Sequence, residues 1–182
     1  TEYIYDPRFK AHMVSVQLDT WTKPRVMAPY QFRAWARTIA WSRVGIVCHN
    51  TAFDGLIASH HFKTRAAFYF DTMSMMRPLL PIQVGHSLDA GAKALGGKGK
   101  VGSQILVDTK GKRDLTPVEY KKMASYAGND LVETWFCFLK MLPYFTVDVL
   151  RTIDIVMKQY CIPRLLIEKG TVDRLLVGVV AR

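Results

Sequence analysis

The chain has 182 residues and a formal net charge of +10 at pH 7, a length that suits one domain with a sizeable hydrophobic core. No apolar run approaches the ~20 residues that cross a bilayer, and the N-terminal segment lacks signal-peptide form, so we expect no membrane partner and a cytoplasmic location. The three cysteines form no Cys-x-x-Cys pair and predict reduced core residues. The basic excess favours a nucleic acid partner, or a surface that only keeps the protein soluble.

Strands and helices alternate through the first part of the chain. Alternating apolar and polar residues predict a strand within 11–21, and a short strand or turn follows at 22–29. Apolar residues at helical spacing predict a helix over 30–41. The continuous apolar run at 43–50 is typical of a fully buried central strand, and a helix follows over 51–62.

The middle of the chain continues this alternation and then loses it. Residues 66–72 predict a further strand, and 73–80 predict a helix that Pro78 bends or ends. A short helix is expected over 87–97, where two glycines stop it. The segment 96–113 is rich in Gly and Lys without periodicity, so we expect a mobile, strongly basic loop.

The last third is helical in pattern. Thr116 as N-cap, Pro117 at the first helical position and Glu119 as capping-box partner predict a helix that runs to about Met141. An amphipathic helix is expected over 146–160, and a strand and the start of a helix over 162–176. These elements together predict an α/β fold, a sheet flanked by helices, whose ligands gather at the carboxyl ends of strands.

Two short patterns place acids where chemistry could occur. Asn50 and Asp54 follow the apolar run, where the carboxylate either caps or solvates a helix or holds a metal. Tyr126 and Asp130 are four residues apart and share one helix face. Such a pair is often incidental, but apolar neighbours make an unpaired carboxylate costly there, and a metal is one suitable partner. Because no histidine pair has zinc spacing, the carboxylates favour Mg²⁺ or Mn²⁺.

These patterns resemble a known family. Asn50-x-x-x-Asp54 and Tyr126-x-x-x-Asp130 resemble the second and third motifs of DEDDy-type 3′–5′ exonucleases, and "FDTMSMMR" is similar to a segment in proofreading domains of family A DNA polymerases. Residues 150–176 resemble the passage into the polymerase domain of certain phage enzymes. The resemblance implies a ribonuclease-H-like α/β fold with a mixed central sheet flanked by helices. Residues 1–145 would form the exonuclease domain, and 146–182 a connecting helix and the start of a polymerase-type domain.

The resemblance also implies a two-metal site and roles for its residues. Asp130 would bind the Mg²⁺ or Mn²⁺ ion that activates water, and Asp54 would help to hold a second ion. Tyr126 would aim the water, and Asn50 would steady the site or the terminal nucleotide. Phe53 would touch the last base, unless it is a buried core aromatic. The basic residues of the loop would neutralise phosphates, unless they are only solvated: Lys98, Lys100, Lys110, Lys112 and Arg113.

The implied partners are a single-stranded DNA 3′ end or primer terminus and a polymerase domain of the same chain. The implied location is the host cytoplasm if a phage encodes the protein. The family needs four carboxylates, and its first motif is Asp-x-Glu, a form that Glu2, Asp6 and Asp19 do not provide. We therefore expect the sequence to begin about 15–25 residues late and to lack both ligands of that motif and a central strand, so that these 182 residues alone are inactive.

Two other functions remain open at this point. One is a free-standing, RNase D-like exonuclease that acts on RNA, against which the polymerase-like passage at 150–176 argues. The other is a catalytically silent nucleic-acid-binding module of the same fold, which the missing carboxylates would permit.

Overall fold

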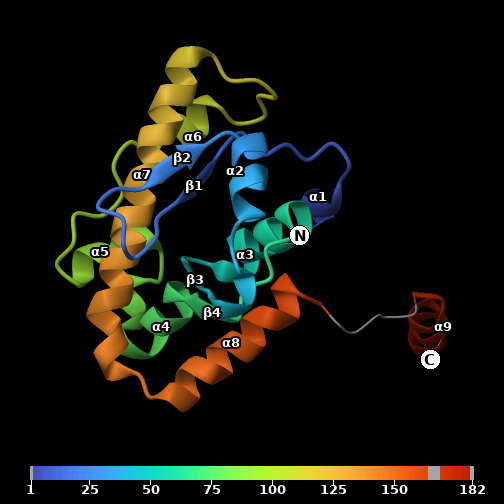
Figure 1. The fold of residues 1–182 in the computed structure, drawn as a ribbon. Coiled ribbons are helices and arrows are strands. Elements are labelled where there is room, and N and C mark those ends of the chain that lie inside the picture. The colour runs from blue at the N-terminus through green and yellow to red at the C-terminus, as the bar shows by residue number, and fades with distance from the viewer. Residues whose placement is uncertain (1, 164–168, 181–182) are drawn as a thin grey trace.

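The structure, a computed structural model, describes residues 2–163 and 169–180 and is a mixed α/β protein in which helices predominate (Figure 1). It contains two sheets of two strands each. Strand β1 (Val14–Val16) is antiparallel to β2 (Arg25–Met27), and β3 (Gly45–Cys48) is parallel to β4 (Phe68–Asp71). The predicted α/β class is confirmed. One continuous mixed sheet is not seen, because no strand among the described residues joins the two pairs.

Most of the helices match the sequence pattern. The helices are α1 (Glu2–Tyr5), α2 (Pro29–Ala36), α3 (Thr51–Phe62), α4 (Thr72–Leu79), α5 (Leu88–Ala94), α6 (Gln104–Asp108), α7 (Pro117–Met141), α8 (Val147–Cys161) and α9 (Lys169–Val180). Of these, α1 and α6 were not expected. Short 3₁₀ turns lie at Trp41–Arg43, Ile82–Val84 and Leu142–Tyr144. No helix in the described part of the chain is long and apolar enough to cross a membrane. The strand expected after residue 162 falls mainly on 164–168, outside the described residues.

The long helix α7 holds the architecture together, since it contacts both sheets as well as α4, α5 and α6. Its start is the predicted capping box. Thr116 Oγ1 accepts the N–H of Glu119 at 3.3 Å, and the Glu119 carboxylate accepts the N–H of Thr116 at 2.8 Å. This exchange satisfies two backbone donors that a helix N-terminus otherwise leaves unpaired.

Three hydrophobic clusters fill the interior. The largest joins α4, α5 and α7 around Met76, Ala92 and Met141, each with no exposed surface. A second cluster joins β4 to α8 through Tyr69 and Met157. The third packs α2 and α3 onto β1, and its buried members are Phe32, Ala36 and Phe62. The three cysteines are free, as the sequence predicts.

Helix α8 covers the outer edge of β4. Asp154, buried on α8, accepts the backbone N–H of Tyr69 at 2.8 Å, and its other oxygen lies 2.6 Å from Lys158 Nζ. A strand edge is normally a row of unpaired polar groups, and a side chain that bonds to it satisfies part of that row. The segment that the sequence assigns to a connector is therefore packed against β4 and α3.

Asp71, at the end of β4, joins the starts of two helices. Its Oδ1 accepts the N–H of Thr51 at 2.7 Å, and its Oδ2 accepts the N–H and hydroxyl of Ser74 at 2.9 and 2.6 Å. Thr51 Oγ1 donates to the carbonyl of Phe70, and Thr72 Oγ1 to that of Cys48. A carboxylate at two helix N-termini also meets two favourable dipoles. The ends of β3 and β4 and the starts of α3 and α4 thus form one bonded unit.

Two expectations from the sequence are wrong. Strand β3 is not fully buried, because Gly45 is exposed and its other residues are only partly covered. The segment 96–113 is not an unstructured loop, because it contains α6 and its first residues are bonded to the body of the protein. Gly97 N–H bonds to the carbonyl of Ala92 at 2.7 Å, and Lys100 N–H bonds to Asp89 Oδ1 at 2.8 Å. The periodicity of apolar residues does not predict such hydrogen bonds, because it contains no information on the partners of individual backbone groups.

We predict that Asp71→Asn lowers the free energy of unfolding by about 2–4 kcal/mol, because an amide NH₂ would face backbone donors that now bond to a charged acceptor. Urea unfolding followed by circular dichroism measures the change. The matched control is Asp148→Asn, an exposed acid in the first turn of α8. An Asp71→Asn protein as stable as this control would contradict the role given to Asp71.

Candidate active site

Asn50 directs the turn from β3 into α3. Its backbone has φ 65° and ψ 57°, a left-handed conformation that asparagine adopts more readily than most residues. The Asn50 carbonyl accepts the N–H groups of Phe53 and Asp54 and so begins the helix. Its own side chain is exposed and makes no capping bond. The turn therefore leaves the Asn50 amide free for a ligand and places Asp54 in the first turn of α3.

Tyr126 and Asp130, one turn apart on α7, are joined by Lys100. The Lys100 Nζ lies 3.0 Å from Asp130 Oδ2 and donates a hydrogen bond of 2.9 Å to Tyr126 Oη. Desolvation lowers the pKa of Lys100, but its bonds to Tyr126 and Asp130 outweigh that effect and raise the pKa overall, so the ammonium stays charged. The second oxygen of Asp130, Oδ1, is buried and has no hydrogen-bond partner among residues 2–163 and 169–180.

Asp54 lies within electrostatic reach of this group. Desolvation is the largest cause that raises the pKa of Asp54 to about 6; Lys100 opposes the shift, and Asp130 and Asp71 add to it. The residue is nevertheless exposed by surface area. The carboxylate therefore keeps access to solvent, while the surrounding protein still desolvates it enough to raise its pKa. The structure thus gathers Asp54, Lys100, Tyr126 and Asp130 from three segments.

Three residues beside this group were not singled out from the sequence. His49 precedes Asn50, its Nδ1 lies 3.0 Å from Thr72 Oγ1, and desolvation lowers its pKa, so the ring is neutral at pH 7. Asp89 and Glu133 accept the backbone N–H groups of Lys100 and Gly99 and fix the position of Lys100. His49 could have been predicted as a site residue because it directly precedes Asn50 in the sequence. No local sequence pattern distinguishes Asp89 or Glu133 from other acidic residues.

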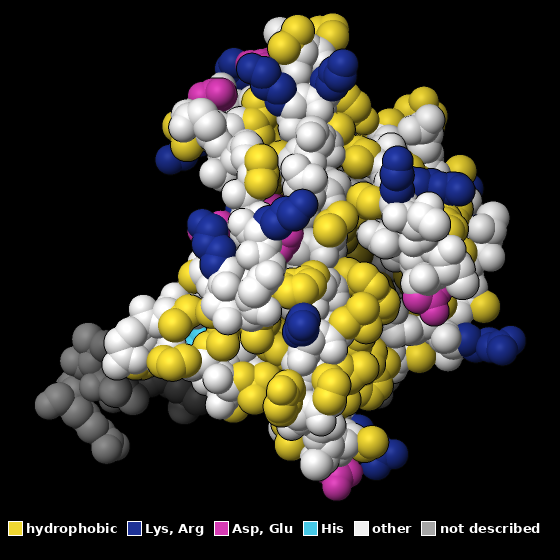
Figure 2. Space-filling model, turned by 90° about the vertical axis from the view of Figure 1, so that its left-hand side faces the viewer, with side chains coloured by type: hydrophobic (Ala, Val, Ile, Leu, Met, Phe, Trp, Pro, Cys, Tyr) yellow, Lys and Arg dark blue, Asp and Glu magenta, His cyan; other side chains and the backbone are white. Residues whose placement is uncertain are grey.

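The remaining predicted residues differ in their surroundings. Phe53 is 37% exposed, so the alternative of a buried core aromatic is wrong and contact with a base remains a prediction. Lys112 pairs with Glu119. Lys98, Lys110 and Arg113 are exposed and form no ion pair with any described residue. On the face that carries α5 and α7, Lys and Arg side chains are scattered among hydrophobic and uncharged ones, without one continuous basic patch (Figure 2).

The donor chemistry fits one hard divalent cation. Mg²⁺ is often held by one or two carboxylates together with waters and substrate phosphates. Asp54 and the Oδ1 of Asp130 offer such oxygens, and Tyr126 Oη shares the Lys100 ammonium with Asp130. Asp71 does not contribute, because hydrogen bonds occupy both of its oxygens. Within residues 2–163 and 169–180, no group of three or more His, Cys, Asp or Glu side chains could hold a metal.

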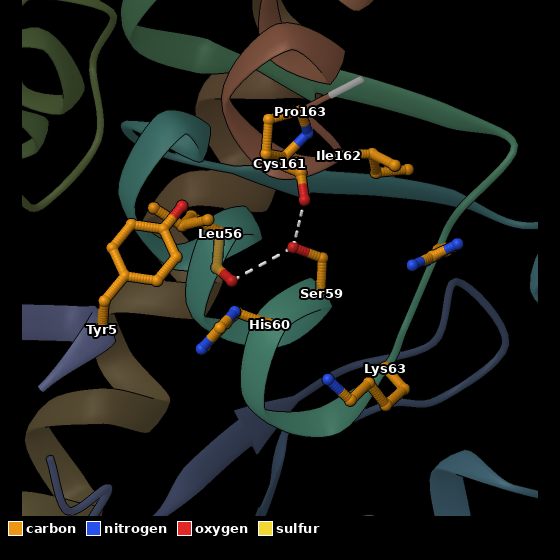
Figure 3. Close-up of a pocket in the computed structure, with 9 residues that line it drawn as sticks. Tyr5, Leu56, Ser59, His60, Lys63, Cys161, Ile162 and Pro163 are labelled. Carbon is orange, nitrogen blue, oxygen red and sulfur yellow. Dashed lines mark hydrogen bonds between the residues drawn. The ribbon is translucent and has the colours of Figure 1, made fainter. Parts of the chain in front are cut away.

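A separate recess of about 180 Å³ lies where the C-terminal ends of α3 and α8 meet (Figure 3). Ser59 points into this contact and donates to the carbonyls of Leu56 and Cys161. The predicted site residues do not line the recess, and the Ser59 hydroxyl is engaged in holding the two helices together. We therefore assign this recess to packing and not to the candidate site.

Comparison with known proteins identifies no relative: no family model matches the chain, and no curated protein or solved structure is significantly similar to it.

We predict that the ionisation of Asp54 weakens the fold. Because its pKa is raised from 3.8 to about 6 in the folded protein, the folded state keeps a proton in that pH window that the unfolded chain has released. The free energy of unfolding contributed by this group therefore falls as the pH rises from about 4 through 6. Asp54→Asn should remove this fall, so that the variant gains stability over the wild type with rising pH.

Urea titrations at pH 4, 5, 6 and 7 in a chelating buffer measure this difference. The control is Asp19→Asn, which replaces an exposed acid outside the candidate site. The assigned environment of Asp54 would be wrong if Asp54→Asn and the wild type kept a constant difference across the series.

Proposed function

We propose that the chain is a 3′–5′ exonuclease domain that hydrolyses phosphodiester bonds at DNA 3′ ends, the proofreading domain of a family A DNA polymerase. The observation that carries the proposal is the gathering of Asp54, Tyr126 and Asp130 from two helices distant in sequence, with Lys100 among them. These are the residues on which the motif resemblance depends, and chance matches in two unrelated segments have no reason to meet in space.

The chemistry needs a water-derived nucleophile and charge compensation at the attacked phosphate, which bound Mg²⁺ or Mn²⁺ supplies. The side chains of Asp54 and Asp130 would hold the ion through their carboxylate oxygens. Tyr126 Oη, hydrogen-bonded within the same group, would orient the attacking water. Asn50, whose amide is exposed at the start of α3, would contact the terminal nucleotide. The exposed ammonium and guanidinium groups of Lys98, Lys110 and Arg113 would neutralise phosphates further along the strand.

A second candidate function is a catalytically silent module that binds nucleic acid. The observation in its favour is that Lys100 already neutralises Asp130, as a substitute for a cation would. In this case the basic residues would carry the function, and the carboxylates would only stabilise the fold.

The decisive assay follows a 5′-labelled single-stranded DNA in Mg²⁺ or Mn²⁺, with the natural polypeptide that contains residues 1–182. We expect stepwise shortening from the 3′ end and its near-complete loss in Asp130→Asn and Asp54→Asn. Tyr126→Phe should lower the rate about ten- to a hundred-fold, because one orienting hydrogen bond is worth roughly 1–3 kcal/mol.

Residues 1–182 by themselves bring two of the four carboxylates that the resemblance calls for, so their turnover should be negligible. The exonuclease proposal fails if the natural polypeptide does not shorten DNA, or if both Asp variants cleave as fast as the wild type. Binding without cleavage would favour the silent module.

We also predict that single-stranded DNA binds with strong salt dependence. Replacing Lys98 and Arg113 by Ala should weaken binding equally for all sequences and reduce the slope of log K against log salt by about 0.7 for each lost phosphate contact. Fluorescence anisotropy between 50 and 200 mM salt, concentrations over which such contacts change affinity strongly, measures the slope. Lys140→Ala is the control, because Lys140 lies in the last turn of α7, outside the segment 96–113. A slope that stays at the wild-type value would show that the segment 96–113 is merely solvated.

A further inference from the structure

The backbone at Gly99 and Lys100 is fixed in a position from which the Lys100 side chain reaches Asp130. Gly99 has φ +76°, and a side chain there would place its Cβ 2.5 Å from Asp89 Oδ1. The Gly99 N–H bonds to Glu133 Oε2 at 3.3 Å, and the Lys100 N–H bonds to Asp89 Oδ1 at 2.8 Å. Two buried or paired acids and one left-handed glycine therefore set the point from which the Lys100 side chain reaches α7.

The ammonium at the end of that side chain stands where a cation would bind. It contacts Asp130 Oδ2 and Tyr126 Oη, two oxygens that could also ligate a metal. Asp130 Oδ1 is left buried without a donor, so the lysine satisfies only half of the carboxylate. An ammonium has at most three donors and a fixed single charge, whereas a divalent ion can bridge both oxygens.

The ammonium and a divalent ion cannot both keep this position. Two cations a few ångströms apart in a half-buried site repel each other strongly, because solvent screens them less than at the surface. The side chains of Lys100 and Asp130 are only 29% and 24% exposed. Occupation of Asp130 by a metal therefore requires the lysine to move, and its flexible four-carbon stem allows that movement while its backbone remains anchored.

We propose that Lys100 is the resident counter-ion of Asp130 and that a divalent cation binds at Asp130 only by displacing the Lys100 ammonium. The identity of the competing ion as divalent rests on the proposed function; the pairing of the two side chains does not. The displaced ammonium is then free to contact a phosphate of the bound strand, so metal loading and substrate neutralisation are linked through one residue. Without substrate, the site is held in a weakly metal-binding state.

The test measures Mn²⁺ binding to residues 1–182 by isothermal titration calorimetry. Lys100→Met, which keeps the apolar stem and deletes the charge, should bind Mn²⁺ at least ten-fold more tightly than the wild type. Lys140→Met, an exposed lysine in the last turn of the helix that carries Asp130, should bind as the wild type does. Asp130→Asn added to Lys100→Met should abolish the gain.

Thermal unfolding gives a second readout. Lys100→Met leaves the Asp130 charge without a partner, so its melting temperature should drop by ~5 °C and recover in excess Mn²⁺. The wild type should show a smaller rise at the same Mn²⁺ concentration. Lys100→Gln keeps a neutral donor for Asp130 and Tyr126, and it replaces Lys100→Met if that variant does not fold.

Equal Mn²⁺ affinity in the wild type and in the neutral Lys100 variant would overturn the proposal, as would the absence of Mn²⁺ binding in both. These outcomes are distinct from failure of the exonuclease assignment, because the readout is ion binding and not hydrolysis. DNA shortening with unchanged Mn²⁺ affinity would overturn the role of Lys100 alone. A ten-fold gain in a protein that never cleaves DNA would support the role of Lys100 and count against the exonuclease.

Discussion

The hydrogen bonds of the Asp71 carboxylate are the constraint on which the candidate site depends. The carboxylate accepts backbone N–H groups from the first turns of both α3 and α4. The hydroxyls of Thr51 and Thr72 donate hydrogen bonds to carbonyls at the ends of β4 and β3. Because α3 begins at this joint, the left-handed turn at Asn50 and the position of Asp54 follow from it. Loss of the joint would free the first turn of α3, and the distance between Asp54 and α7 would no longer be set.

Three aspartates near one another show how surroundings decide what a carboxylate can do. Asp71 is buried and both of its oxygens are bonded, so it is structural. Asp130 is bonded through one oxygen and unpartnered at the other, which leaves it able to accept a further cation. Asp54 keeps solvent access while neighbouring protein and acids raise its pKa to about 6. Hydrogen bonding and burial thus decide whether a carboxylate is fully bonded, as in Asp71, partly bonded, as in Asp130, or open to solvent with a raised pKa, as in Asp54.

The segment that carries Lys100 illustrates a related balance. Asp89 on α5 and Glu133 on α7 accept backbone N–H groups of this segment and so fix the position of the lysine. That lysine pairs with the Asp130 carboxylate and donates a hydrogen bond to the Tyr126 hydroxyl. An internal positive charge of this kind offsets part of the repulsion and desolvation of neighbouring carboxylates. The cost is that any external cation must compete with it.

Most local structure was determined by the sequence alone. The capping box of Thr116, Pro117 and Glu119 defines the start of α7, and the apolar periodicities gave α3, α8 and β4 within a few residues. These features depend on neighbours three or four positions away, so a linear pattern contains them. The i,i+4 spacing of Tyr126 and Asp130 likewise follows from helix geometry.

The tertiary structure decided the rest, because it depends on contacts between residues far apart in the chain. The division into two sheets, the partial exposure of β3 and the anchoring of 96–100 could not be read from periodicity. Nor could the partner of Asp130, since Lys100 comes from a glycine-rich segment that has no regular pattern of its own. Sequence determined which side chains could do chemistry, and only the packing of α3, α7 and the segment before α6 decided which of them meet.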